Sequence, residues 1–160
     1  EWKPVVVRIK SDTPAGEIRV VPQTFSLYLT LGDRRAIRYR VGIGRGNLYE
    51  PGRFYLGAKK EWPTWRPTDE MIARNPAAYA KYADGMPGGP GNPLGSRALY
   101  LFTPKRGDTF LRIHGTTDPW TIGTAVSNGC VRLVNGHVED LYARAQIGAP
   151  IILHPKDPEA

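Results

Sequence analysis

A chain of 160 residues has the length of one ordinary domain and can bury a single hydrophobic core. Hydrophobic residues make up 41% and charged residues 23%, as in a globular protein, and the absence of any apolar run of about 18 residues excludes a transmembrane helix. Lysine and arginine exceed aspartate and glutamate by 22 to 15, which favours acidic partners such as nucleic acid, anionic membranes or the bacterial wall without choosing among them.

Short runs rich in valine and aromatic residues predict β-strands along most of the chain. In residues 25–31, apolar and polar side chains alternate, which is typical of a strand with one buried face. Gly32-Asp33 follows as a turn, and the alternation of apolar residues with arginines in 37–41 completes a hairpin whose arginine face should meet solvent. We expect strands at residues 3–9, 17–21, 25–31, 37–41, 98–103, 110–114 and 149–154.

Helical patterns are confined to two regions. Thr68 is placed to cap a short helix over residues 69–74, and Asn75-Pro76 restarts a second one through Tyr82. Near the end of the chain, apolar residues recur at helical spacing between 138 and 145, with Asn135 placed as the cap. Residues 85–95 are too rich in glycine and proline for a helix or central strand, so we expect a long loop there, of the kind that often borders a site.

Many short strands separated by turn residues indicate a mainly β fold, either a sandwich or a barrel. We find no internal repeat and expect residues 1–160 to form one domain.

The single cysteine, Cys130, cannot form an internal disulfide and is therefore an apolar core residue, a metal ligand or a reactive thiol. His114 lies sixteen positions earlier; a histidine within reach can take the thiol proton, and an ion pair with it lowers the thiol pKa. Gly129 frees the backbone so that its N–H and that of Cys130 can face an oxyanion. Arg132 suits a substrate carboxylate or orients the loop. A lone cysteine is more often core filler, and only the joint pattern favours a nucleophile.

The order and spacing of five segments in residues 17–153 resemble the L,D-transpeptidase catalytic domain, also called the YkuD family. They are Tyr49-Glu50-Pro51-Gly52-Arg53-Phe54, Trp62-Pro63-Thr64-Trp65-Arg66-Pro67, the glycine/proline loop ending in Asn92-Pro93-Leu94-Gly95, Ile113-His114-Gly115-Thr116, and Ser127-Asn128-Gly129-Cys130-Val131-Arg132. The resemblance implies that family's sandwich-like or barrel-like β-domain with a few short helices, in which the nucleophile loop leads into the final helix beside His114.

The resemblance also implies a reaction. Cys130 would attack the carbonyl between the third and fourth residues of a peptidoglycan stem tetrapeptide and release D-alanine. His114 would act as base and then acid, oriented by the carbonyl of Gly115. Backbone amides of Asn128, Gly129 and Cys130 would form the oxyanion hole. The thioester would pass to an amine of a neighbouring stem peptide and form a 3–3 cross-link.

Other implied properties concern the surroundings of that reaction. The substrate would be a wall peptide, so we expect a periplasmic or cell-envelope location, although no signal peptide is visible at Glu1. An envelope protein, a free D-amino acid or water are alternative acyl acceptors, and carbapenems should acylate the thiol. The mechanism requires no metal and no organic cofactor. The expected substrate-binding residues are Arg132, Ser127, Trp62, Trp65 and Asn92.

Two positions depart from the family pattern. Asn128 stands where many members carry histidine, which weakens any role for a second histidine in the loop. His137 stands where an acidic residue often opens the final helix, a change worth about 0.3–1 kcal/mol of helix-end electrostatics.

Three alternatives compete with this interpretation. Cys130 and the three histidines, His114, His137 and His154, are zinc-ligand types, but no closely spaced pair is present. Residues 42–46 carry three glycines but lack the spacing of a dinucleotide fingerprint, and we expect a hairpin-end loop.

The third alternative is a basic β-domain that binds wall or nucleic acid without catalysis, stacking sugars or bases on Trp62, Trp65 and Trp120. Such a module has no need for a glycine-cysteine pair with a histidine at this spacing, so we expect no nucleic-acid partner.

Overall fold

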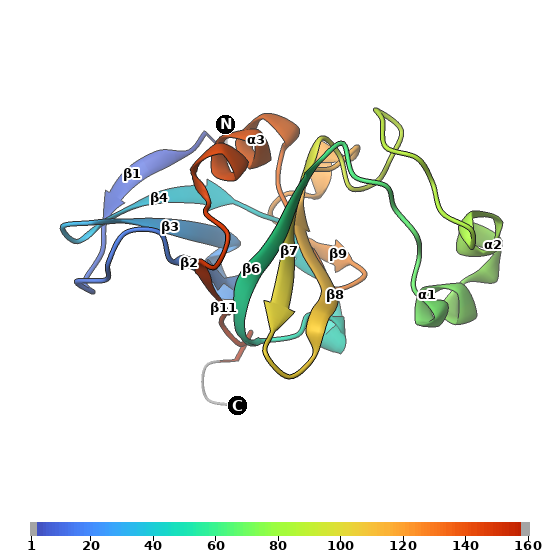
Figure 1. The fold of residues 1–160 in the computed structure, drawn as a ribbon, viewed down its shortest axis with the longest axis horizontal. Helices are drawn as coiled ribbons and strands as arrows, with labels where there is room; N and C mark the ends of the chain where they lie inside the picture. Colours follow the sequence, from blue (N-terminus) through green and yellow to red (C-terminus); the bar gives the residue numbers. More distant parts are fainter. Residues whose placement is uncertain (1–2, 158–160) are drawn as a thin grey trace.

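The computed structural model describes residues 3–157 as a strongly curved β-sheet with one helix packed on it and a long arm at one end (Figure 1). Nine strands lie in the order β1-β4-β3-β2-β11-β6-β7-β8-β10, and β5 and β9 form a small parallel pair. The strands of the large sheet are β1 (Val5–Arg8), β2 (Ile18–Val21), β3 (Ser26–Gly32), β4 (Arg35–Arg40), β6 (Gly52–Glu61), β7 (Arg97–Thr103), β8 (Gly107–His114), β10 (Val131–Arg132) and β11 (Pro150–Leu153). The small pair consists of β5 (Ile43–Gly44) and β9 (Ala125–Ser127).

Short helices connect or cover these strands. The longest is α3 (Asn135–Arg144), which packs on β7 and β8. The arm carries α1 (Asp69–Arg74), α2 (Pro76–Tyr79) and the 3-10 turn η3 (Ala80–Tyr82). The other 3-10 turns are η1 (Pro22–Thr24), η2 (Gly46–Leu48) and η4 (Pro119–Thr121). The predicted mainly β class is therefore confirmed.

The hydrophobic core lies against one face of the large sheet, as alternation along the strands predicts. In β2, Ile18 and Val20 are fully buried while Arg19 points to the other face, and β3 buries Leu27 and Leu29 in the same way. Val138 and Leu141 of α3 close the core from outside the sheet. The hydrophobic effect on this face holds the strands in register, since a shift of one residue would expose every core side chain.

The last strand joins the two halves of the sheet. β11 pairs in parallel with β2, placing Ile151 beside Ile18, and antiparallel with β6, placing Ile151 beside Phe54. The chain after β11 is tied back by the hydroxyl of Tyr49, which donates to the carbonyl oxygen of His154 at 2.5 Å. The N-terminal and C-terminal parts of the chain are thus parts of one sheet.

Three sequence-based expectations are corrected. The strand β6, at Gly52–Glu61, was not predicted, because only Phe54 and Leu56 of its ten residues are buried and a bulge interrupts its alternation. Residues 42–46 are not a hairpin end, since β5 pairs in parallel with β9. Asn135 is the first residue of α3 and makes no cap; Val134 is the N-cap.

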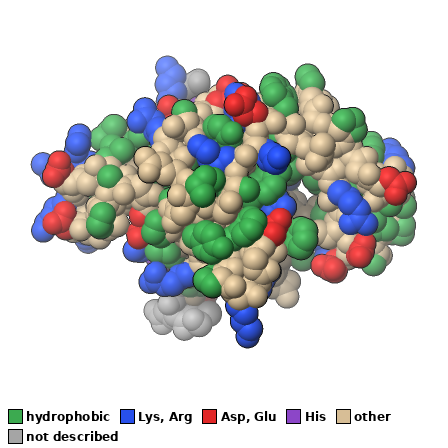
Figure 2. All heavy atoms as spheres, viewed as in Figure 1, with side chains coloured by type: hydrophobic (Ala, Val, Ile, Leu, Met, Phe, Trp, Pro, Cys, Tyr) green, Lys and Arg blue, Asp and Glu red, His purple; other side chains and the backbone are tan. Residues whose placement is uncertain are grey.

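The arm contains its own small hydrophobic cluster and stands apart from the sheet in Figure 2. Thr68 caps α1 by accepting a hydrogen bond from the N–H of Met71, and Asn75 caps α2, as predicted. The ring of Trp65 packs edge-on against Tyr79 and Tyr82, with ring centres 6.2 and 5.7 Å away. These contacts let the arm hold a defined shape outside the main core.

Among residues 3–157, no helix is long and apolar enough to cross a membrane.

Replacing Ile151 by alanine should lower the free energy of unfolding by about 2–5 kcal/mol, because the side chain is fully buried between β2 and β6 and its loss leaves a cavity. Urea unfolding followed by tryptophan fluorescence measures the change. Val6→Ala on the edge strand β1, where the side chain is 60% exposed, is the control and should change stability by no more than about 0.5 kcal/mol. Equal losses in the two variants would contradict the placement of the core.

Candidate active site

The two strands that carry the predicted nucleophile and base are neighbours. β10 pairs in parallel with β8, so that Val131 lies beside Ile113 and Arg132 beside His114. The N–H of Leu133 donates to the carbonyl oxygen of His114 at 2.8 Å and extends this pairing by one bond. Cys130 precedes β10 and therefore lies at the level of Arg112, one strand away. Segments sixteen residues apart in the chain are brought together by this short ladder.

The sulfur of Cys130 has a specific backbone partner. The N–H of Arg112 donates to Sγ at 3.3 Å, a contact that favours the thiolate over the thiol. Strand β8 has a left-handed residue just before this point, Phe110 with φ of 65°, and the pairing with β7 shifts register opposite it. Such a bulge re-aims the residues that follow. The bulge in β8 thus lies next to Arg112, whose backbone N–H donates to the thiol.

The imidazole of His114 is held by its own neighbour. Its Nδ1 lies 2.5 Å from the carbonyl oxygen of Gly115, and because a carbonyl only accepts, Nδ1 carries the proton. The other ring nitrogen, Nε2, is then the basic one. His114 is buried, so the ring has little freedom to leave this orientation. The predicted role of Gly115 as an orienting carbonyl agrees with this geometry.

Burial determines the charge of both groups. It lowers the pKa of His114 to about 3, and the nearby guanidinium groups of Arg132 and Arg112 act in the same direction against the bond to Gly115. Burial also raises the pKa of Cys130, and the N–H and charge of Arg112 offset only part of that rise. At neutral pH the free protein holds a thiol and a neutral imidazole. The ion pair that the sequence suggests is therefore not favoured in the free protein, since burial raises the pKa of the thiol and lowers that of the imidazole.

The loop before the nucleophile is held by a serine hydroxyl. Ser127 is buried, and its hydroxyl donates to the carbonyl oxygen of Cys130 at 2.6 Å while accepting from the N–H of Gly129 at 3.3 Å. The Gly129 N–H is therefore directed to Ser127 in this state. These bonds give Ser127 a part in shaping the loop.

Close backbone packing supports the loop from below. Gly129 has φ of 125°, which favours glycine, and a side chain there would lie 2.9 Å from the carbonyl oxygen of Leu48. A side chain at Gly44 would lie 2.8 Å from Cα of Gly129. Gly42 and Gly44 thus allow one stretch of backbone to pass close to another. This role was missed in the sequence, where only their spacing was visible.

Arg132 is largely removed from water and incompletely paired. Its Nη1 donates to the hydroxyl of Thr121 at 3.3 Å, while its buried Nε has no hydrogen-bond partner within residues 3–157. Burial lowers the pKa of the guanidinium and the negative charge of Asp118 raises it, the first effect being larger. An unsatisfied buried donor next to Cys130 is suited to an anion supplied by a ligand.

The arm touches the nucleophile loop at one residue. Asn128 donates from Nδ2 to the hydroxyl of Tyr79 at 2.9 Å and accepts from Nη2 of Arg74 at 3.3 Å. The amide of Asn128 thus has one partner on α1 and one on α2. Asn128 therefore links the arm to the loop that contains Cys130.

The other predicted substrate residues lie in the arm and its base. The side chain of Trp62 is half exposed, and its backbone N–H donates to the carbonyl oxygen of Ser96 at 2.7 Å. Trp65 packs inside the arm, as described above. Asn92 is buried, and its amide binds the carbonyl oxygens of Met86 and Pro87 within the loop. The contacts of Asn92 give it a part in shaping the loop, whereas Trp62 remains accessible.

Asn135, predicted as a helix cap, instead binds two backbone N–H groups far away in the sequence. Oδ1 of Asn135 accepts from the N–H groups of Ser96 and Thr116, each at 3.2 Å, and joins the start of β7 to the segment after His114. The backbones of Gly95 and Gly115 lie so close that a side chain on either would collide with this oxygen. Long-range partners of this kind leave no local trace in the sequence.

Within residues 3–157, no group of three or more His, Cys, Asp or Glu side chains is arranged to hold a metal ion. His154 lies on the outer side of β11, next to Arg19.

Comparisons with known proteins agree on one family. The model of the YkuD L,D-transpeptidase catalytic domain matches residues 15–153. A putative L,D-transpeptidase of Fuscovulum blasticum is 35% identical over 143 residues, covering 85% of this chain and 69% of that protein. The probable L,D-transpeptidase YbiS of Escherichia coli is 34% identical over 126 residues, but the match covers 78% of this chain and only 39% of YbiS.

Solved structures share the fold. A crystal structure described as a probable carnitine operon oxidoreductase from Brucella melitensis is 46% identical, with a TM-score of 0.66, and covers 93% of this chain and 91% of that one. L,D-transpeptidase 3 of Mycobacterium tuberculosis has a TM-score of 0.61 at 17% identity, covering 89% of this chain and 62% of that one.

The rate at which iodoacetamide alkylates Cys130 should keep rising as the pH is raised past the ordinary thiol pKa, because burial keeps the thiol protonated. Intact mass against time at each pH gives the rate, and a short cysteine peptide gives the reference curve. A rate that reaches its plateau below pH 7 would show a thiolate–imidazolium pair and contradict the neutral resting state.

Replacing Gly115 by alanine should cost about 1–3 kcal/mol of unfolding free energy, because the new methyl group would lie 2.0 Å from Oδ1 of Asn135. Gly136→Ala is a matched control in α3, where a side chain meets nothing within 4 Å, and should be neutral or stabilising by up to about 1 kcal/mol. Urea unfolding compares the two, and equal stabilities would contradict the close packing behind His114.

Proposed function

Because this chain belongs to the L,D-transpeptidase family, we propose that Cys130 is acylated by a peptidoglycan stem tetrapeptide and passes the acyl group to an amine. The observation that carries this proposal is the hydrogen bond from the N–H of Arg112 to Sγ, in a ladder that sets His114 one strand away. A buried filler cysteine would not need a donor aimed at its sulfur from a bulged strand. The sequence spans about four tenths of YbiS, so this proposal concerns the catalytic domain.

In the proposed first step, the thiol loses its proton to Nε2 of His114 as sulfur attacks the carbonyl carbon between the third and fourth residues. A neutral imidazole is the form that can accept this proton, and the bond to Gly115 fixes the tautomer. The C–N bond then breaks, the imidazolium returns the proton to the leaving amine, and D-alanine departs. A thioester on Cys130 remains.

In the second step an acceptor amine attacks the thioester and the thiol is restored. We assign that acceptor to the third residue of a neighbouring stem peptide, which gives a 3–3 cross-link. Covalent anchoring of an envelope protein, exchange with a free D-amino acid and hydrolysis use the same acyl-enzyme with a different acceptor. A stem-peptide substrate places the reaction in the periplasm or cell envelope.

The oxyanion that forms in both steps needs donors near the nucleophile. The backbone N–H of Cys130 is the first candidate. The N–H of Gly129 joins it only if its bond of 3.3 Å to Ser127 is exchanged, and that long bond is weak enough to exchange. Asn128 contributes by its position in the loop, which the arm fixes.

We assign Arg132 to the carboxylate of the substrate's third residue. Its buried Nε gains a hydrogen-bond partner when an anion binds. This new hydrogen bond then contributes to the free energy of substrate binding. Trp62, at the exposed base of the arm, is proposed as a wall of the same cleft, and Trp65 and Asn92 support the arm behind it.

Treatment with a carbapenem should add one drug mass to the protein, and Cys130→Ala should abolish both this adduct and the release of D-alanine from a tetrapeptide. The matched control is Arg106→Ala, an exposed side chain on the turn between β7 and β8 that should leave both reactions intact. Intact-mass spectrometry and D-alanine quantification are the measurements. An adduct or cross-linking that persists in the cysteine variant would end the mechanism. Absence of any adduct with retained wall binding would support the non-catalytic binder instead.

Replacing Arg132 by alanine should slow acylation by the tetrapeptide about 10- to 100-fold, as expected for the loss of a charged hydrogen bond, with less effect on the release of a preformed acyl group. Single-turnover acylation and deacylation are measured separately by mass. A substrate amidated at the third-residue carboxylate is the control, since it should lose rate with the native protein and little more with the variant. Equal acylation of the acidic substrate by both proteins would contradict this role.

A further inference from the structure

The net positive charge of the protein comes from residues 1–60. Residues 1–60 contain twelve Lys and Arg against five Asp and Glu, whereas residues 61–160 contain ten of each. The entire excess of seven charges therefore belongs to the segment that forms β1 to β6. In Figure 2, several Lys and Arg side chains lie at the end of the molecule formed by β1, β3 and β4, with Asp and Glu side chains among them.

Sheet register arranges part of this charge in a line. Arg38 on β4 lies beside Tyr28 on β3, which lies beside Arg19 on β2. Arg19 lies beside Ile152 on β11, and Ile152 beside Arg53 on β6. These five residues, which we call the arginine row, cross five strands on the face opposite the core. Neighbouring strands are about 4.8 Å apart, so successive arginines are about 10 Å apart at the backbone.

The arginine row has a preformed centre. Ile152 is 7% exposed between the stems of its two arginine neighbours, an arrangement in which long side chains cover apolar surface and keep their charges in water. Arg19 is held by Glu17 through Nε at 2.5 Å, and its Nη1 lies 3.4 Å from Nε2 of His154. None of the ion pairs in the described part of the chain involves Arg38 or Arg53, so their guanidinium groups are available to a ligand.

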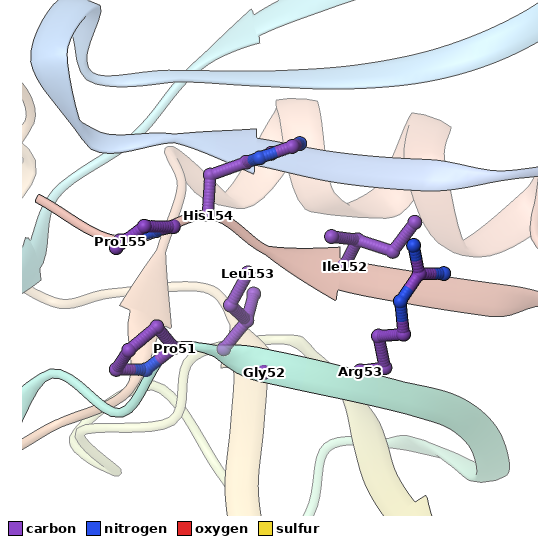
Figure 3. A pocket seen from close by; sticks show the side chains of 7 residues that line it. All are labelled: Pro51, Gly52, Arg53, Ile152, Leu153, His154 and Pro155. Carbon is purple, nitrogen blue, oxygen red and sulfur yellow. The ribbon is translucent and has the colours of Figure 1, made fainter. Parts of the chain in front are cut away.

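A hollow extends one end of the row. Pro51, Arg53, Ile152, His154 and Pro155 are among the residues around a depression of about 380 Å³, and Figure 3 shows Arg53, Ile152 and His154 pointing to the same side of β6 and β11. The face is therefore indented where the charge lies.

We propose that the arginine row binds an acidic polysaccharide strand in which carboxylate-bearing sugars alternate with neutral ones. Arginine guanidinium groups match carboxylates in a bidentate manner, and Tyr28, which lies between two of them in the row and is partly exposed, is placed to pack against a neutral sugar. The row lies on strands β4 to β6, whereas Cys130 and His114 lie at β8 and β10, so the two sites share no residue. This inference goes beyond the proposed function and does not depend on it.

The spacing distinguishes this partner from other polyanions. A nucleic-acid strand carries one charge per about 3.4 Å of axis, which is much denser than arginines about 10 Å apart. A membrane surface is contacted best by side chains that protrude, whereas Ile152, between Arg19 and Arg53 in the row, is buried and the adjoining face carries a shallow depression. The line of charges with an aromatic ring between them therefore favours a polymer with spaced carboxylates.

His154 reports on occupancy of the row. Burial and the positive charges of Arg19 and Arg53 lower its pKa, and Glu17 opposes them. A carboxylate bound between the two arginines would offset their charge and raise this pKa. Binding should therefore take up protons and tighten as the pH falls toward the ordinary histidine range.

Binding of a hyaluronan oligosaccharide, which alternates a carboxylate sugar with a neutral one, tests the proposal with the complete chain. Calorimetry at low salt should show binding that the double variant Arg38→Gln/Arg53→Gln weakens at least about tenfold, because two charged contacts are lost. The control Lys60→Gln/Lys105→Gln removes the same net charge from exposed positions outside the row and should change the dissociation constant less than about twofold. The chemical shift of His154 against pH, with and without the oligosaccharide, should show the rise in its pKa.

Three outcomes would overturn the proposal. One is equal weakening in both double variants, which would mean a diffuse charge effect. Another is tighter binding of single-stranded DNA or of anionic phospholipid vesicles at matched charge concentration and salt. The third is absence of hyaluronan binding by the native protein. Carbapenem acylation of Cys130 should be the same in all variants. Loss of hyaluronan binding would therefore not affect the proposed transpeptidase function, and absence of a carbapenem adduct would not affect the proposed role of the arginine row.

Discussion

Two residue pairs between β8 and β10 fix the positions of all the site groups. This parallel ladder is short, yet β10 is held on its other side as well, because the N–H of Arg132 donates to the carbonyl oxygen of Gly42 at 2.9 Å and the reverse bond has the same length. A strand of two residues with neighbours on both sides cannot shift without breaking bonds to both. The thiol, its N–H donor and the imidazole consequently keep one arrangement.

Desolvation explains why the site is neutral at rest and still suited to catalysis. A buried imidazole with a pKa near 3 is a weak base, and the partly exposed Cys130 thiol, whose pKa is raised by desolvation, is a weak acid, so proton transfer between them is unfavourable at rest. Two nearby guanidinium groups, Arg112 and Arg132, disfavour the imidazolium further. A substrate carboxylate on Arg132 would reduce that positive field. On the proposed mechanism, Arg132 would therefore link substrate binding to the basicity of His114.

Patterns in the sequence predict those parts of the structure whose cause is local. Alternation along residues 25–31 and 37–41 predicted β3 and β4. Strand β6 was not predicted because a bulge interrupts its alternation. At the bulge Gly57 packs against the ring of Phe102, and a side chain there would lie 2.3 Å from the ring. Asn135 was misassigned because its partners, Ser96 and Thr116, are 39 and 19 residues away. The neutral state of the site depends on burial, which no local pattern contains.

The curved sheet separates a reactive edge from a charged face. Charge close to the thiol is costly, since each added guanidinium would lower the pKa of His114 further and weaken the base. Residues that attract an acidic polymer are therefore best placed on strands remote from β8, where solvent screens them from the site over about 8–10 Å. The confinement of the whole net charge to residues 1–60 satisfies this constraint, because those residues form β1 to β6 and contribute only glycine-rich backbone next to Cys130. A basic protein can in this way keep the Cys130 thiol and the His114 imidazole uncharged.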